Sequence, residues 1–220
     1  MINRVVGLYF SPRGGTAKIT EQIAKEVAAE LQDRCTGGQE IACLCYDIDR
    51  VPATELDLDE NSVVVIGMPV RVGKLSLPAL AKLREISGSG AMAIELVSYG
   101  TMSYGNALYE LHYHAEDMGF KVVGAGAFVV KHRGPGDRNL VRPDLNDLNE
   151  IRDFSAAISN KLARLSGCEI DALRIKPTPL LIAGRMPIHR ISKLSPDAAV
   201  IAERTFEKVT VFRKNPEWYL

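Results

Sequence analysis

The sequence lacks the cysteine spacing of a metal or iron–sulfur centre. Its four cysteines are Cys35, Cys43, Cys45 and Cys168, and no two of them form a CxxC pair. The usual zinc and iron–sulfur motifs are therefore excluded. Cys43 and Cys45 stand two residues apart in an expected strand, so their side chains share one face of it. We expect free, buried thiols in a reducing cytosol.

The chain also lacks net charge and long apolar runs. Its 27 Lys and Arg balance 27 Asp and Glu, so the composition gives no sign of a nucleic-acid partner. No window approaches the roughly 18 apolar residues of a membrane helix, and the apolar run after Arg4 is too short for a signal peptide. At 220 residues, the chain can form one well-buried domain plus an appendage, or two small domains. We expect a cytoplasmic protein that binds neither nucleic acid nor membrane.

Three signatures of phosphate chemistry are missing as well. No Gly-Lys pair follows Gly14 or Gly15 at the Walker spacing, and no GxGxxG is present, which disfavours a P-loop nucleotide hydrolase and a dinucleotide fold. A response regulator would need acidic residues after the first strand and an Asp after the third. Tyr9-Phe10 and Met68-Pro69 stand there instead.

What is present is an alternation of apolar runs and amphipathic stripes. The apolar runs predict five strands, at residues 4–10, 40–48, 62–68, 91–98 and 121–130. Apolar residues at helical spacing predict the helices, over residues 19–31, 80–86, 108–118 and 148–165, with Gly119 as a C-cap. This alternation indicates an α/β fold. We expect a three-layer, doubly wound domain with a five-stranded parallel sheet of order 2-1-3-4-5.

The chain divides near Gly167. Residues 1–166 hold the predicted domain, and residues 167–220 are proline-rich at first and mildly basic. We expect an extended stretch followed by a helix with Ser195 as N-cap and Pro196 at its first position. Such a segment is an arm that forms a lid or a homodimer contact, not a separate domain.

The segment Ser11-Pro12-Arg13-Gly14-Gly15-Thr16 joins the first strand to the first helix. Two glycines let backbone N–H groups approach an anion, two hydroxyls add donors, and the helix N-terminus adds favourable partial charge. The segment predicts a phosphate site. A turn that serves only the chain geometry remains the alternative.

Two further loops end at the same predicted edge of the sheet. In residues 67–78, Pro69 and Gly73 bracket three residues whose backbone groups can lie beside a planar ring. In residues 98–108, Tyr99 and Tyr104 offer aromatic stacking. Plain connections and a surface tyrosine pair remain the alternatives. A phosphate cradle with two ring-contacting loops predicts a mononucleotide such as FMN.

With these segments, the sequence resembles the flavodoxin superfamily, whose phosphate loop is of the Ser-x-Thr-Gly-Asn-Thr type. More narrowly, it is similar to the flavodoxin half of anaerobic flavodoxin–ferredoxin fusion proteins, over residues 4–166. The chain departs from that pattern at Arg13, where the family has Thr or Gly, and at Arg71, where it often has an aromatic. No CxxCxxC cluster follows Gly167, so a ferredoxin part is missing from this sequence.

The resemblance implies a flavodoxin-like fold that binds FMN non-covalently. It implies backbone contacts from Val72 and Gly73 to the N5 edge of the ring, with a peptide flip at Gly73 on one-electron reduction. The residues expected to bind FMN lie in the three loops. They are Ser11, Arg13, Gly14, Gly15, Thr16, Ala17, Pro69, Val70, Arg71, Val72, Gly73, Ser98, Tyr99, Gly100, Tyr104 and Gly105.

The expected function is electron transfer between redox partner proteins. The first alternative is an FMN-dependent NAD(P)H oxidoreductase of the quinone or flavin reductase type, with the basic arm over the flavin. The second alternative is a non-redox scaffold that has lost flavin. Arg13 and Arg71, which depart from the family pattern, keep this alternative open. We expect no catalytic side chain and no metal site.

The histidines add little to this interpretation. His112 and His114 point about 200° apart on a helix, so they cannot chelate one metal from one face, and we expect surface positions for both. His132 follows the fifth strand, where it either tunes the ring or is a plain loop residue.

Overall fold

The computed structural model describes residues 2–35, 40–100, 103–131, 142–166 and 182. In this part of the chain the strands are β1 Arg4–Tyr9, β2 Ala42–Asp47, β3 Ser62–Arg71, β4 Lys74–Leu75, β5 Met92–Tyr99 and β6 Lys121–Val129. The helices are α1 Gly15–Cys35, α2 Leu77–Leu83, α3 Ala107–Asp117 and α4 Leu145–Ser166, with a 3₁₀ turn at Ala53–Glu55.

The sheet has the predicted topology. The strand order is β2-β1-β3-β5-β6, and all four neighbouring pairs along this path are parallel. The predicted fourth and fifth strands are β5 and β6, so the order 2-1-3-4-5 is confirmed. The structure adds β4, which pairs with the end of β3 in an antiparallel hairpin. The sequence prediction missed this hairpin.

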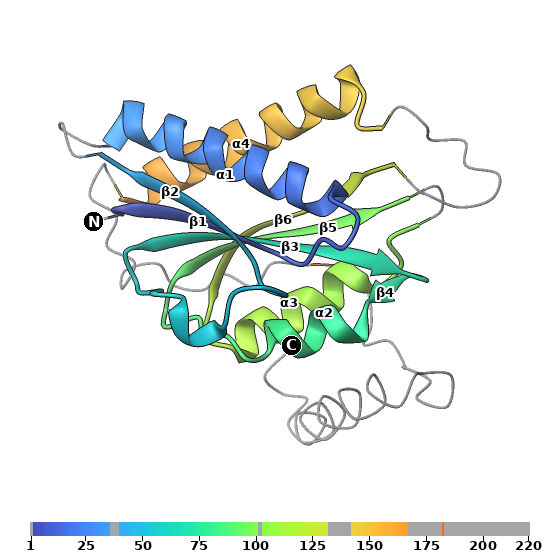
Figure 1. The fold of residues 1–220 in the computed structure, drawn as a ribbon. Helices are drawn as coiled ribbons and strands as arrows, with labels where there is room; N and C mark the ends of the chain where they lie inside the picture. The colour runs from blue at the N-terminus through green and yellow to red at the C-terminus, as the bar shows by residue number, and fades with distance from the viewer. Residues whose placement is uncertain (1, 36–39, 101–102, 132–141, 167–181, 183–220) are drawn as a thin grey trace.

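Helices cover both faces of the sheet, which makes three layers (Figure 1). Helices α1 and α4 lie on one face, and α2 and α3 lie on the other. Each face holds a separate apolar cluster, one with Ile23 of α1 and Leu162 of α4, the other with Leu80 of α2 and Leu111 of α3. The strands are apolar on both sides because each side meets a helix layer. The fold is therefore the doubly wound, flavodoxin-like architecture.

The predicted helix boundaries agree with the structure to within a few residues. Gly119 lies just beyond α3 with a φ of 86°, as a helix-ending glycine does. Of the predicted arm, only Ile182 is described, and it packs, partly buried, against the α2 and α3 cluster. The extended stretch, the helix from Ser195 and His132 lie outside the described residues.

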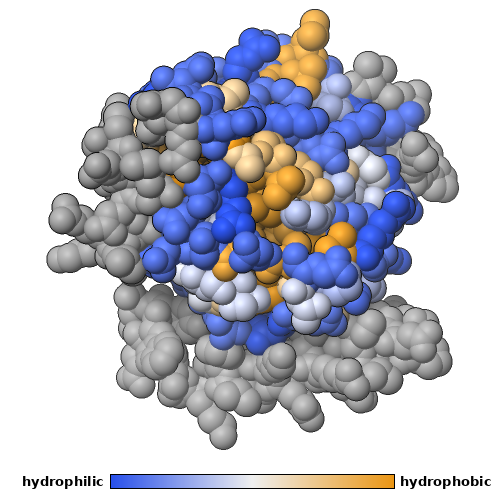
Figure 2. All heavy atoms as spheres, turned by 60° about the vertical axis from the view of Figure 1, so that its left-hand side comes forward, coloured by the Kyte–Doolittle hydropathy of each residue, from blue (hydrophilic) through white to orange (hydrophobic). Residues whose placement is uncertain are grey.

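None of the described helices is long and apolar enough to cross a membrane. Figure 2 shows the side of the molecule that lies to the left in Figure 1, and there apolar side chains reach the surface between hydrophilic margins. Leu44 of β2 is the large apolar residue that this edge strand exposes, at 44%. The edge strand is thus less covered than the strands inside the sheet.

A buried acid–base pair lies beneath α3. Glu95 of β5 is fully buried, and its Oε2 lies 3.2 Å from Nδ1 of His112. Oε1 of Glu95 has no hydrogen-bond partner among the described residues, and Nε2 of His112 lies 3.6 Å from Oε1 of Glu116. Burial raises the pKa of Glu95 to about 7, against the opposing effect of His112. Burial lowers the pKa of His112, but Glu95 outweighs this and leaves it raised.

The expectation that His112 and His114 lie at the surface is wrong, because both are buried. Helix α3 contacts β5 and β6 beneath it and β4 at its side, so it is covered beyond its apolar stripe. Polar partners compensate the burial: His112 faces Glu95, and Nδ1 of His114 lies 2.5 Å from a guanidinium nitrogen of Arg84. No group of three metal-ligating side chains is found among the described residues.

We expect replacement of Glu95 by Gln to flatten the pH dependence of stability. With both pKa values raised by folding, the folded chain holds more protons than the unfolded chain from about pH 4.5 to above pH 7. The free energy of unfolding therefore falls as pH rises through this window, by up to about 1.4 kcal/mol per pH unit for each proton. Urea unfolding at pH 5 and pH 8 measures this slope.

Glu116→Gln is the matched control, since this carboxylate is more exposed and lies farther from the imidazole. It should leave most of the slope intact. A Glu95→Gln variant with the wild-type slope would show that the pair does not take up a proton on folding.

Candidate functional site

The three loops predicted to bind a ligand meet at the carboxyl ends of β1, β3 and β5. Two hydrogen bonds join them. The hydroxyls of Thr16 and Ser98 lie 2.7 Å apart, which links the start of α1 to the end of β5. The N–H of Asn106 donates to the carbonyl oxygen of Gly73 at 2.8 Å, which links the third loop to the β3–β4 hairpin. The topology thus brings the predicted residues together at one edge of the sheet.

The first loop forms a turn at the N-terminus of α1. The N–H of Gly14 donates to the carbonyl oxygen of Ser11 at 3.1 Å, and the N–H of Ala17 donates to Oγ of Ser11 at 2.9 Å. The first N–H that donates within the helix is that of Lys18, to the carbonyl oxygen of Gly14, so the N–H groups of Gly15 and Thr16 point out of the helix end. Gly14 has a φ of 79° and open space where a side chain would project. The loop leaves a cradle of backbone donors at a positive helix end.

Thr16 and Ser98 differ from the other predicted phosphate and ring contacts, because both are buried. Their hydroxyls bond to each other beneath the loop. Pro12 and Arg13 of the same loop are exposed. The hydroxyl at the loop surface is that of Ser11, which accepts one bond and can still donate its own proton.

The predicted second loop is largely regular structure. Pro69, Val70 and Arg71 belong to β3, and only Val72 and Gly73 form the turn to β4. Both turn residues have positive φ, 53° and 72°, as the two central residues of a type I′ turn require. A valine there is strained, because its branched Cβ crowds the backbone in the left-handed region. Val72 is nevertheless 91% exposed, so no packing offsets the strain.

The hairpin end also concentrates positive charge. Arg71 and Lys74 are opposite each other across the two strands, so both cationic residues flank the hairpin turn. Arg71 is exposed. An exposed cationic side chain favours a nearby anion.

The third loop supplies two aromatic rings. Tyr99 and Tyr104 pack edge to face, with ring centroids 5.6 Å apart and planes at 63°. The carbonyl oxygen of Tyr99 accepts the N–H of Val130 at 2.8 Å, which fixes the end of β5 against β6. Tyr104 is 36% exposed, so its ring reaches the surface beside the hairpin. Gly100 follows Tyr99 at the strand end, and Thr101 and Met102 are not described.

A carboxylate that the sequence analysis did not single out holds the hairpin. Glu110 of α3 is buried, and its Oε2 accepts the N–H of Leu75 at 2.8 Å. The bond ties β4, and with it the strained turn, to the first half of α3. In the sequence, the one feature that could have indicated this role is that Glu110 is an acidic residue between Leu108 and Leu111 of the apolar stripe.

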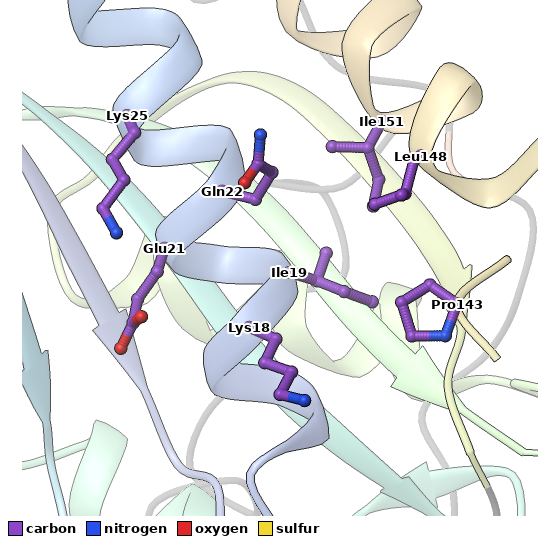
Figure 3. Close-up of a pocket in the computed structure, with 8 residues that line it drawn as sticks. All are labelled: Lys18, Ile19, Glu21, Gln22, Lys25, Pro143, Leu148 and Ile151. Atoms are coloured by element: carbon purple, nitrogen blue, oxygen red, sulfur yellow. The ribbon is translucent and has the colours of Figure 1, made fainter. Parts of the chain in front are cut away.

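A hollow of about 310 Å³ lies elsewhere, between α1 and the start of α4 (Figure 3). Lys18, Ile19 and Gln22 line it from α1, and Pro143 and Leu148 line it from the other side. None of the predicted site residues is among its lining residues. The hollow is therefore separate from the meeting point of the three loops.

No protein-family model and no curated protein sequence matches this chain. Several solved structures are similar in fold. An oxidoreductase from Corynebacterium diphtheriae has a TM-score of 0.50 and 15% identity, over 74% of this chain and 96% of that one. A flavodoxin from the domain Archaea has a TM-score of 0.48 and 18% identity, over 72% and 97% of the two chains.

A flavodoxin, WrbA-like protein from Agrobacterium tumefaciens gives a TM-score of 0.42 with 16% identity, over 72% of this chain and 96% of that one. At identities this low, the structural similarity shows the fold alone, and that fold is flavodoxin-like. The resemblance seen in the sequence is confirmed at this level, and a fusion with ferredoxin is not shown.

We expect Gly105→Ala to destabilise the chain far more than Gly14→Ala. Gly105 has a φ of 56°, and a Cβ there would lie 2.6 Å from both Cα and O of Gly73. Backbone atoms cannot move aside as the end of a flexible side chain can, so the third loop and the hairpin must separate. We expect this to lower the free energy of unfolding by about 2–4 kcal/mol. Gly14 has similar φ but open space, so its replacement costs about 1 kcal/mol. Urea unfolding of both variants compares them; equal losses would contradict the Gly73–Gly105 contact.

We expect Val72→Asn to stabilise the chain by about 1 kcal/mol, because Asn tolerates the left-handed conformation and Asn-Gly suits a type I′ turn. Thermal or urea unfolding detects this gain. The conservative control is Val70→Ile in the adjoining strand, where no positive φ is relieved. A loss of stability in Val72→Asn would show that the branched side chain has a packing role.

Proposed function

We propose that this chain binds FMN at the meeting point of the three loops and acts as a redox protein. The observation that carries the proposal is the pair of hydrogen bonds Thr16–Ser98 and Asn106–Gly73. These bonds join the phosphate-type cradle, the hairpin turn and the aromatic loop at the switch point of the doubly wound sheet. Proteins with this architecture bind their ligands at that point.

The residues present fit a flavin mononucleotide. Gly14 leaves open the space beside the first-turn N–H groups of α1, which suits a phosphate monoester. Tyr104 offers a partly exposed aromatic face, and Val72 offers an exposed apolar side chain at the hairpin tip. An isoalloxazine ring needs such apolar and aromatic walls with few polar contacts. When bound, the flavin supplies the electron transfer chemistry.

The protein's own residues would hold and orient that group. The backbone N–H groups of Gly15 and Thr16 and the hydroxyl of Ser11 would hold the phosphate. The backbone of Val72 and Gly73 would lie along the ring edge, with Glu110 fixing the hairpin through Leu75. The Arg71 and Lys74 pair favours electron-rich states of a neighbouring ligand.

The strain at Val72 supports a functional role for the hairpin tip. A left-handed valine without packing costs about 1–3 kcal/mol, and backbone strain of this kind clusters at ligand sites. A bound ring beside Val72 would bury the exposed side chain and offset part of this cost.

We take the electron transfer to run between protein partners, with FMN cycling between redox states. The cationic end of the hairpin suits a partner with an acidic surface near its own redox centre. The alternative is hydride transfer from NAD(P)H to a small acceptor such as a quinone. Steady oxidation of NAD(P)H by the purified, FMN-loaded chain would select that alternative.

The first experiment is a titration of the purified chain with FMN and with riboflavin, followed by absorption and flavin fluorescence. Binding of FMN with clear preference over riboflavin is expected, since only FMN carries the phosphate. Ser11→Ala should weaken FMN binding about tenfold, the loss of one charge-assisted hydrogen bond, and change riboflavin binding little.

Because Ser11 also caps α1 through Ala17, the ratio of the two affinities is the decisive quantity. An equal loss for both flavins would assign Ser11 a structural role only. A chain that takes up neither flavin would refute the FMN proposal and leave the non-redox scaffold.

A further inference from the structure

A pair of free thiols lies on the edge strand β2. Cys43 and Cys45 are both free thiols, Cys43 exposed and Cys45 partly buried. The expectation of buried thiols is therefore wrong for Cys43. Both side chains lie on the face of the sheet beneath α1, because residues two apart in a strand point the same way. Cys45 packs against the apolar cluster of α1 and α4.

Room for the inner sulfur comes from a glycine in the neighbouring strand. Cys45 is in register with Gly7 of β1. A Cβ on Gly7 would lie 2.8 Å from Sγ of Cys45, closer than atoms approach without displacement. Glycine weakens a strand interior, and it recurs where another group must come close. Gly7 thus leaves room for the sulfur of Cys45, in a strand whose other inner positions carry apolar side chains.

The surroundings make the two thiols unequal. The neighbouring Cys45 thiol stabilises the Cys43 thiolate, and Lys25 of α1 adds positive charge, so the pKa of Cys43 falls to about 7. The same interaction with Cys43 raises the pKa of Cys45, and burial raises it further. The other groups that face the pair are Glu21 of α1 and Tyr9 of β1, both next to Cys45.

We propose that Cys43 and Cys45 form a redox-active thiol pair that reacts with low-molecular-weight disulfides, with Cys43 as the attacking thiol and Cys45 as the resolving thiol. Cys43 is exposed, as an attacking thiol must be, and Cys45 lies on the same strand face, two residues along, as a resolving thiol must. The proposal is independent of flavin binding.

The reaction balances in two steps. The Cys43 thiolate attacks one sulfur of a disulfide RSSR, which forms a Cys43–SR mixed disulfide and releases RS⁻. Cys45 then loses its proton to the released thiolate and attacks the Cys43 sulfur, which forms a Cys43–Cys45 disulfide and releases a second RS⁻. The two protein thiols lose two electrons, and RSSR gains them.

The first step also activates the second. The negative charge on Cys43 is a cause of the raised pKa of Cys45. In the mixed disulfide this charge is gone, so the Cys45 thiol ionises more easily. The Cys45 thiol therefore stays protonated, and unreactive, until Cys43 has formed the mixed disulfide.

The edge position permits the closure. Residues two apart in an extended strand have Cα atoms about 6.6 Å apart, near the upper limit for a disulfide, so the backbone from Cys43 to Cys45 must contract slightly. The N–H of Ala42 donates to Asn3, just before β1, and the N–H of Ile48 donates to Tyr9 of β1. By alternation, the backbone groups of Cys43 and Cys45 point away from the sheet. A strained disulfide on an exposed edge is readily reduced, which makes the change reversible.

The experiment treats the full chain with oxidised glutathione and maps the products by mass spectrometry. The chains compared are wild type, Cys43→Ser and Cys45→Ser, each also in a background with Cys35 and Cys168 replaced by Ser. Wild type should yield the Cys43–Cys45 disulfide without stable adduct. Cys45→Ser should accumulate the glutathione adduct on Cys43, and Cys43→Ser should react at least several-fold more slowly.

The pH dependence of Cys43 alkylation by iodoacetamide is the second measurement. Its midpoint should lie near pH 7 in wild type and move toward the usual thiol value of about 8.5 in Cys45→Ala. Lys25→Gln should move it in the same direction by less. A persistent adduct on Cys43 of the wild-type chain, or equal rates for Cys43 and Cys45, would overturn the proposal.

Discussion

A parallel sheet allows no tight turns between neighbouring strands, and this constraint organises the whole molecule. Each of the five parallel strands must connect to the next parallel strand through a crossover, so their carboxyl ends all lie at the same edge. The order β2-β1-β3-β5-β6 places β1, β3 and β5 side by side there. Three connections with unrelated sequences are thereby forced into contact. The proposed flavin site follows from topology before any side chain contributes to it.

Buried polar groups then fix the geometry that topology makes possible. Glu110 holds the hairpin through Leu75, and the Thr16 and Ser98 hydroxyls join α1 to β5. Each of these groups has a partner within hydrogen-bond distance. A hydrogen bond fixes the distance and direction between two segments more specifically than an apolar contact does. Helix α3 is central to this arrangement, because it carries both Glu110 and the His112 that faces Glu95. The site and the proton-binding pair therefore share one helix.

The sequence was sufficient for the architecture because strand and helix periodicities are local. The run at 62–68 and the stripe from Ile19 to Leu31 needed no tertiary information. The β3–β4 hairpin was missed because Val-Gly is not a residue pair that signals a type I′ turn. The burial of His112 and His114 was missed because it depends on β4 and on the sheet together. The loops of the site were found from composition, but the inward turn of Thr16 toward Ser98 required coordinates.

One consequence of the layering concerns synthesis of the chain. Helices α1 and α4 lie on the same face of the sheet (Figure 1). Ile23 of α1 and Leu162 of α4 belong to one apolar cluster there. Along the chain α1 is the first helix and α4 the last described. A nascent chain that has folded β1, α1 and β2 must therefore wait for almost the whole domain before that layer closes. During this interval the α1 face is a natural contact for a chaperone, whereas the α2 and α3 layer is completed earlier.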